Sequence, residues 1–134
     1  MNSLKGHIKE VHFSGSLSLV TVELSDKILF KAILIETPKT ASYLVVGQAV
    51  KVLFKETEVI VGKDMKHFIS LQNRIRGVIM LIERGVLLCN IHIQTPAGDI
   101  SSIITTNAVD ELQLKEELSV WAMVKTNEIM LSES

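Results

Sequence analysis

Hydroxyl side chains and a lysine lie close together in two stretches of the second half of the chain. The stretches are "DISSIITTN" and "VKTNE", and they offer Ser101, Ser102, Thr105, Thr106, Lys125 and Thr126. A tetrahedral oxyanion needs many directed hydrogen-bond donors, which hydroxyls, backbone N–H groups and an ammonium group supply together. The residue types therefore predict an oxyanion site. The alternative interpretation is a set of ordinary solvent-facing strand residues.

Other reactive side chains do not form a recognisable motif. The histidines His7, His12, His67 and His92 are scattered, and no two of them stand at a metal-ligand spacing with a cysteine or carboxylate. Cys89 lies in "LLCNI", where a small buried apolar residue is expected. The sequence has no nucleophile elbow, phosphate-binding lysine loop or glycine-rich dinucleotide turn. We therefore expect a binding protein and not an enzyme, with no resident metal ion.

Composition limits the partners and the compartment. The net charge of -1 gives no field that attracts nucleic acid or anionic membrane. Hydrophobic residues make up 47% of the chain and aromatic residues only 4%, so the apolar side chains are mainly aliphatic and favour strands. A small domain cannot bury so many of them, which predicts subunit interfaces. A single cysteine and the absence of a signal-like or membrane-spanning apolar run predict a soluble cytoplasmic protein.

The chain repeats itself. "FKETEVIV" and "VKTNEIML" share one pattern and are separated by 70 residues, the distance from Lys55 to Lys125. Apolar positions stay in phase at this offset, which predicts one structural unit over residues 1–66 and a second over 67–134. The coincident pairs include Gly15 with Gly85, Ile33 with Ile103, Leu44 with Leu114, Val50 with Val120 and Glu58 with Glu128.

The residue pattern of each unit predicts five short strands and one short helix. Thr37 and Pro38 suit the N-cap and first position of a helix in the first unit, and Asn107 suits the N-cap of "AVDEL" in the second. Parallel βαβ units are excluded because one short helix per unit cannot supply the crossovers. We therefore predict an all-β protein of two tandem small five-stranded antiparallel OB-like barrels, each with one short helix.

The ordered motifs, present twice, resemble those of a di-Mop molbindin, in which two Mop (TOBE-type) domains follow one another. "SLQNRIRGVIMLIERG" resembles the family's opening pattern Ser-Ala-Arg-Asn followed by a glycine. "ISSIITTNAVDELQLKEELSVWAMVKTNEIML" is similar to its ending, a Thr/Ser-Ala-x-Ile-Thr strand, a helix and a Lys-Ala/Ser-Thr strand. "NSLKG" and "KAILIETPKTASYLVVGQAVKVLFKETEVIV" follow the same plan in the first unit.

The resemblance implies the ligand, the assembly and the residues of the site. It implies molybdate or tungstate bound as an oxyanion, with no metal ligand in the usual sense, in a homotrimer that forms a pseudo-hexamer of domains. The implied binding residues are Ser70, Asn73, Ser101, Ser102, Thr105, Lys125 and Thr126 in the second unit, and Asn2, Lys31, Ala32 and Lys55 in the first.

The two units do not match equally well. At the offset of 70 residues, Ile35 aligns with Thr105 and Glu56 aligns with Thr126. The first unit therefore has an apolar residue and a carboxylate where the second has hydroxyls, and we expect the second unit to hold the better site. The resulting hypothesis is an intracellular molybdate or tungstate binder for storage, homeostasis or delivery to molybdenum cofactor synthesis. The alternatives are a free-standing molybdate-sensing module that acts through a protein partner and an OB-type nucleic-acid binder. The low aromatic content argues against the nucleic-acid alternative.

Overall fold

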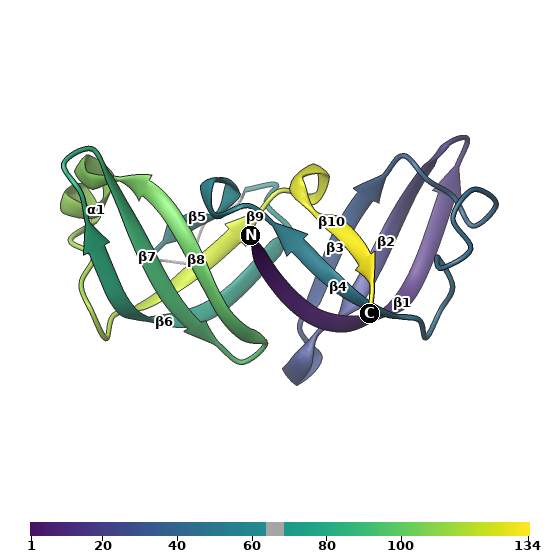
Figure 1. Ribbon diagram of the computed structural model, residues 1–134, viewed down its shortest axis with the longest axis horizontal. Helices are drawn as coiled ribbons and strands as arrows, with labels where there is room; N and C mark the ends of the chain where they lie inside the picture. Colours follow the sequence, from purple (N-terminus) through teal and green to yellow (C-terminus); the bar gives the residue numbers. More distant parts are fainter. Residues whose placement is uncertain (64–68) are drawn as a thin grey trace.

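Two five-stranded antiparallel sheets lie side by side in the computed structural model, which describes residues 1–63 and 69–134 (Figure 1). The first sheet has the order β10-β4-β1-β2-β3 and the second the order β5-β9-β6-β7-β8. The strands of the first sheet are β1 (Asn2–Ser14), β2 (Leu17–Glu23), β3 (Leu29–Leu34), β4 (Ala49–Phe54) and β10 (Met130–Glu133). Those of the second are β5 (Ile60–Gly62), β6 (Asn73–Arg84), β7 (Leu88–Thr95), β8 (Gly98–Thr105) and β9 (Ser119–Val124).

The two halves of the chain exchange one short strand. β5 belongs to the first half and pairs with β9 in the second sheet, whereas β10 comes from the second half and pairs with β4 in the first. Each sheet therefore contains four strands from one half and one strand from the other. The predicted boundary between residues 66 and 67 lies outside the described residues, and the division at that point stays a prediction about sequence units.

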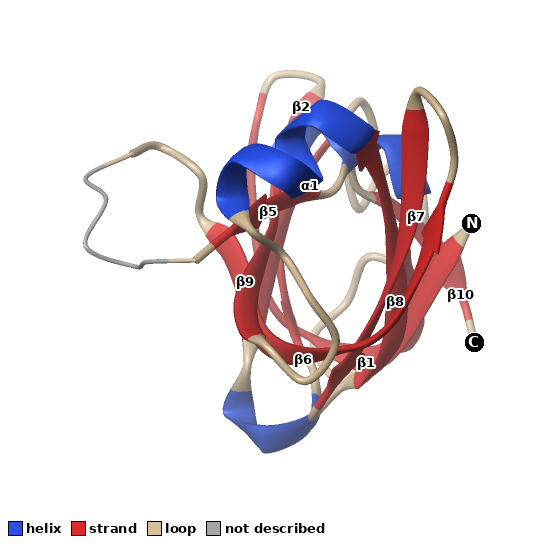
Figure 2. Cartoon of the chain, turned by 90° about the vertical axis from the view of Figure 1, so that its left-hand side faces the viewer, coloured by secondary structure: helices blue, strands red, loops and turns tan. Residues whose placement is uncertain are grey.

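Alternating side chains build the core. On β4 the side chains of Val50, Val52 and Phe54 are fully buried, and those of the intervening residues are not. This period of two is the expected pattern for a strand with one face on the core. Figure 2 shows strands of the second sheet curving around a common interior, with the helix α1 (Thr106–Leu112) over one end.

Each sheet bends at one glycine and one bulge. A Cβ on Gly6 would lie 2.6 Å from the backbone oxygen of Glu23, and one on Gly77 would lie 2.7 Å from that of Gln94. No side chain fits there, so glycine permits the close approach of backbones that a strongly curved sheet requires. The register shifts three residues later, between Ile8 and Glu10 in one sheet and in the same place in the other. Such a bulge increases the local twist.

The repeat is not aligned by a single offset. Gly6 lies opposite Val50 and Gly77 lies opposite Val120, so the glycines are 71 residues apart and the valines 70. The extra residue is in the turn between the second and third strands, which is one residue longer in the first half. Matching Gly15 with Gly85 was therefore wrong. The structural counterpart of Gly85 is Ser14, and Gly15 occupies the following turn with φ 61°.

The helix predicted in the first half does not form. Thr37 begins a single turn instead, in which its carbonyl accepts from the N–H of Ala41 at 2.8 Å. Residues 39–43 are "KTASY", in which only Lys and Ala are strong helix formers, whereas "AVDEL" contains Ala, Glu and Leu. In the second half, α1 begins two positions earlier than expected, with Thr105 and not Asn107 as the N-cap. Within the described residues, no helix is both long and apolar enough to cross a membrane.

Deleting residues 130–134 tests the strand exchange. β10 covers the outer edge of β4, from Leu53 to Val50, so the deletion leaves those backbone groups unpaired. We expect amide hydrogen exchange to accelerate in β4, at residues 49–54. β9 ends only six residues before the deletion but pairs with β5 and β6, and it should keep its protection. Loss of protection in β9 with β4 unchanged would contradict the exchange.

Candidate functional site at the two junctions between the sheets

The start of β1 meets β8 at a first junction, formed by Asn2, Ser101, Ser102 and the segment that begins at Lys55. The Asn2 side chain donates from Nδ2 to the backbone oxygen of Ser101 at 2.8 Å and accepts from the Ser101 N–H at 2.8 Å. The 3₁₀ turn η2 (Glu56–Glu58) packs against β8. The hydroxyl of Ser102 donates to the backbone oxygen of Val59, directly after this turn, at 2.9 Å. Residues of the first half, Asn2 and Val59, are therefore hydrogen-bonded to two neighbouring residues of β8, which belongs to the second half.

The start of β6 meets β3 at a second junction built in the same way. Asn73 accepts from the Lys31 N–H through Oδ1 at 2.7 Å and donates from Nδ2 to the Lys31 carbonyl at 2.8 Å. The 3₁₀ turn η3 (Thr126–Glu128) packs against β3 and begins directly after Lys125. The second junction therefore combines Asn73, Lys31, Ala32, Lys125 and Thr126.

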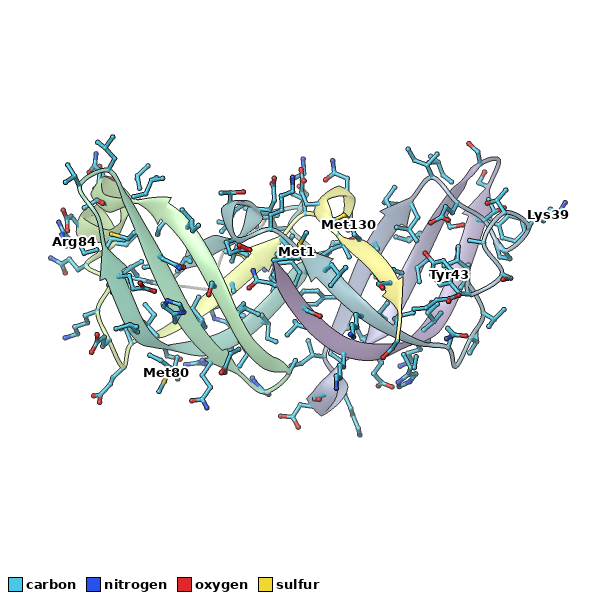
Figure 3. All side chains as sticks on the ribbon, viewed as in Figure 1. Met1, Lys39, Tyr43, Met80, Arg84 and Met130 are labelled. Carbon is cyan, nitrogen blue, oxygen red and sulfur yellow. The ribbon has the colours of Figure 1, made fainter. Side chains whose placement is uncertain are left out.

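The candidates group across the halves of the chain and not within them. Ser101 and Ser102 share a junction with Lys55 from the first half, whereas Lys125 shares one with Lys31. The expectation that the second unit holds the better site stays a prediction. The turns that carry the lysines cross over with β5 and β10, so the candidates of one unit are divided between the two junctions. In Figure 3, Met1 and Met130 lie near the middle of the molecule, where the halves meet.

Burial divides the candidates by role. Asn2, Asn73 and Ser102 have 6%, 0% and 0% of their surface exposed, and their side chains are hydrogen-bonded to backbone groups of this chain. Ala32 is also buried. These side chains fix the backbone at the junctions. The donors with access to solvent are the half-buried Ser101, Thr126 and Lys31 and the exposed Lys55 and Lys125.

The remaining two candidates lie elsewhere. Ser70 is exposed and precedes β6. Thr105 is at the far end of β8 from the Asn2 contact, where its hydroxyl accepts from the Ala108 N–H at 3.0 Å and caps α1. Thr105 therefore has a local structural role. At about 3.3 Å per residue, it is more than 10 Å along the strand from Ser101.

A carboxylate at the first junction is compensated by a nearby cation. Glu56 stands beside Lys55 and would repel a bound dianion if it were unpaired. Its Oε2 accepts from the Met1 ammonium at 3.1 Å, and this hydrogen bond holds the pKa of the Glu56 carboxyl below its ordinary value. The repulsion expected from the sequence is thereby reduced.

The two 3₁₀ turns face one another across a cavity of about 190 Å³, lined by Lys55, Glu58, Asn127, Glu128 and Met130. The cavity contains residues from both halves, so the two junctions adjoin. Within residues 1–63 and 69–134, no cluster of three or more His, Cys, Asp or Glu side chains is placed to hold a metal ion.

The structure adds His92 to the first junction. Its Nδ1 lies 3.3 Å from the Ser101 hydroxyl, and its Nε2 is hydrogen-bonded to Glu83. Spacing along the sequence could not reveal this group because its members stand on three different strands. The register that pairs His92 with Ser101 is the signal that does reveal it.

Comparison with known proteins agrees with these features. The TOBE domain model matches residues 69–131. Molybdenum-pterin-binding proteins 1 and 2 of Clostridium pasteurianum are 30% and 31% identical to this chain over 64 residues, which cover 94% of each relative and 47% of this chain. The chain belongs to the Mop/TOBE-type molbindin family.

A solved structure extends the likeness in fold over both halves of this chain. The structure of the cytoplasmic molybdate-binding protein ModG with molybdate bound superposes with a TM-score of 0.92 at 24% identity. The match covers 99% of this chain and 96% of ModG. The fold of two sheets is therefore shared along the whole length, including the half that the TOBE model leaves unmatched.

Removing the Asn73 amide should destabilise the protein. Asn73→Ala removes the side-chain partner of the partly buried N–H and carbonyl of Lys31, and we expect a loss of about 1–3 kcal/mol in unfolding free energy. Urea unfolding at fixed protein concentration measures it. Asn107→Ala is the matched control, because Asn107 is exposed and its loss should change stability by less than about 0.5 kcal/mol. Equal stability of the two variants would show that the amide does not hold the junction.

Proposed function

We propose that this molbindin binds molybdate or tungstate reversibly inside the cell, for storage, homeostasis or delivery to molybdenum cofactor synthesis, without catalysing a reaction. The observation that carries the proposal is the pair of reciprocal junctions. At each one a buried asparagine fixes a strand backbone beside a lysine and a solvent-accessible hydroxyl. Membership of the family and the fold shared with molybdate-bound ModG support it.

Binding would rest on directed donors and not on bulk charge. The hydroxyls of Ser101 and Thr126 and the lysine ammonium groups can each donate to an oxygen of a tetrahedral dianion. Since these donors are half-buried or exposed, one chain encloses an anion only in part. The structure thus offers fewer donors than a fully coordinated oxyanion would use, and a second copy of the chain is the natural source of the rest.

We further propose a homotrimer, a pseudo-hexamer in which each sheet forms a closed OB-like barrel. The exposed aliphatic side chains support an oligomer, because Ile35, Val86 and Leu87 are 83%, 93% and 78% exposed in the single chain. Such large apolar exposure is unfavourable in water and is normally covered by another subunit.

The alternatives make different demands on the surface. A sensing module would use the same anion site and add a protein partner, so it differs only in what binds the loaded protein. A nucleic-acid binder needs exposed aromatic side chains for base stacking. Of the aromatic side chains in the described residues, Phe13 alone is exposed. Phe30 and Phe54 are buried in the core, Tyr43 is half-buried, and Trp121 is half-buried beneath Arg76.

Calorimetric titration with four anions tests the proposal. A site of hydroxyl and N–H donors sized for a large tetrahedral dianion should bind molybdate and tungstate more tightly than sulfate or phosphate. Competition against excess sulfate measures the preference directly. Tighter binding of sulfate than of molybdate would contradict the storage role.

Substitution of the two lysines tests the grouping of the site residues. Lys55→Met and Lys125→Met each remove a charge-assisted hydrogen bond, which should weaken molybdate binding about ten- to a hundredfold while the apolar stem is kept. Ser101→Ala should be energetically coupled to Lys55→Met and additive with Lys125→Met, because only Lys55 shares its junction. Coupling of Ser101→Ala to Lys125→Met, with additivity toward Lys55→Met, would contradict this grouping and would indicate a site made by the second unit alone.

A further inference from the structure

Three side chains form a hydrogen-bonded row across the second sheet. Glu83 is on β6, His92 on β7 and Ser101 on β8. His92 is directly opposite Ser101 in the register, and Glu83 reaches His92 diagonally, since Glu83 itself pairs with Asn90. The Nε2 of His92 is bonded to Oε1 of Glu83, and its Nδ1 is 3.3 Å from the Ser101 hydroxyl. The backbone of Ser101 is held by Asn2 at the same time. The row therefore ends at the first junction.

The carboxylate determines the tautomer of a neutral His92. An ionised Glu83 can only accept, so the Nε2 of His92 carries the proton and donates it. The Nδ1 of the neutral ring then has only a lone pair, and the Ser101 hydroxyl must donate its single hydrogen to it. In this state the hydroxyl hydrogen is directed to the ring and is not available to an oxyanion.

Protonation of His92 reverses this hydrogen bond. Both ring nitrogens of an imidazolium donate, so Nδ1–H donates to the Ser101 oxygen and the hydroxyl hydrogen becomes free to turn toward an anion. The added positive charge also lies one side chain away from that anion. Both effects act in the same direction.

Other charged groups face the same region. Asp99 on β8 lines a hollow of about 130 Å³ together with His92 and Ser101, and Glu83 adds a second carboxylate. The Met1 ammonium pairs with Glu56 on the turn packed against β8. The backbone N–H of Ser101 donates to Oδ1 of Asn2, so this N–H is not available to a bound oxyanion.

We propose that His92 is a positioning residue for the oxyanion site, and that binding of molybdate at the first junction tightens when His92 gains a proton. The inference rests on the proposed function, because it concerns the same anion. In this proposal Glu83 fixes the tautomer of His92. The Ser101 hydroxyl donates to Nδ1 when His92 is neutral and to the anion when His92 is protonated.

The test is calorimetric titration with molybdate at about pH 6 and about pH 8, the interval in which histidine ordinarily changes its charge. We expect the unaltered protein to bind about tenfold more tightly at the lower pH, the value of one hydrogen bond to a charged group. His92→Phe and Ser101→Ala should both lose this ratio. The matched control is His12→Phe, which removes a histidine paired with Glu10 on the other sheet and should retain the ratio.

Glu83→Gln separates tautomer control from a purely structural role. The glutamine amide can donate to Nε2 as well as accept from it, so the His92 proton is no longer confined to Nε2. With the proton on Nδ1, the Ser101 hydroxyl is free even at the higher pH. We expect tighter molybdate binding than in the unaltered protein at about pH 8, and a smaller ratio between the two pH values. A structural role predicts weaker binding instead, and that result would overturn the proposal.

The outcomes distinguish the two levels of inference. No molybdate binding by the unaltered protein at either pH would overturn the proposed function and the role of His92 with it. Molybdate binding with the same pH ratio in the unaltered protein and in His92→Phe would overturn the role of His92 alone.

Discussion

Neither half of the chain can pair all the edge-strand backbone groups of its own sheet, and the rest of the structure depends on this constraint. The backbone groups on the outer edges of β4 and β9 are paired by β10 and β5, which come from the opposite half of the chain. Unpaired edges cost free energy and invite association, so each half needs the other to be complete. The exchange carries the turns η2 and η3 onto the opposite sheet. The buried amides of Asn2 and Asn73 then fix β8 and β3 at the two contacts.

The junctions are similar in backbone but differ in chemistry. Ser101 at the first occupies the place that Lys31 has at the second, and each is gripped through its backbone by an asparagine. Each asparagine bonds only to the backbone N–H and carbonyl of its partner, so the side chain at the position of Ser101 or Lys31 is free to vary. One junction can therefore present a neutral hydroxyl linked to a histidine, and the other an ammonium group. The compensation of Glu56 by the Met1 ammonium limits the electrostatic difference between them.

Periodicity predicted most of the fold, because alternating burial such as that of Val50, Val52 and Phe54 is visible in the sequence. It did not identify the asparagines, lysines and serines at the junctions, which the resemblance to the family implied. It could not show which half of the chain pairs with β5 and β10, since short aliphatic strands fit either sheet equally well in pattern. The extra residue before β3 and the missing helix after Thr37 depend on turn chemistry that a repeat alignment ignores. His92 was missed because only the register places it against Ser101.

The pairing of β4 with β10 has a consequence for biosynthesis. β4 leaves the ribosome about eighty residues before its partner does. The first sheet to be translated is thus the last to be completed, whereas the second receives β5 before its own strands are made. A nascent or prematurely terminated chain presents the edge of β4 to other chains. Long-range pairing of this kind is slow to form, so final closure of the first sheet follows the synthesis of β10.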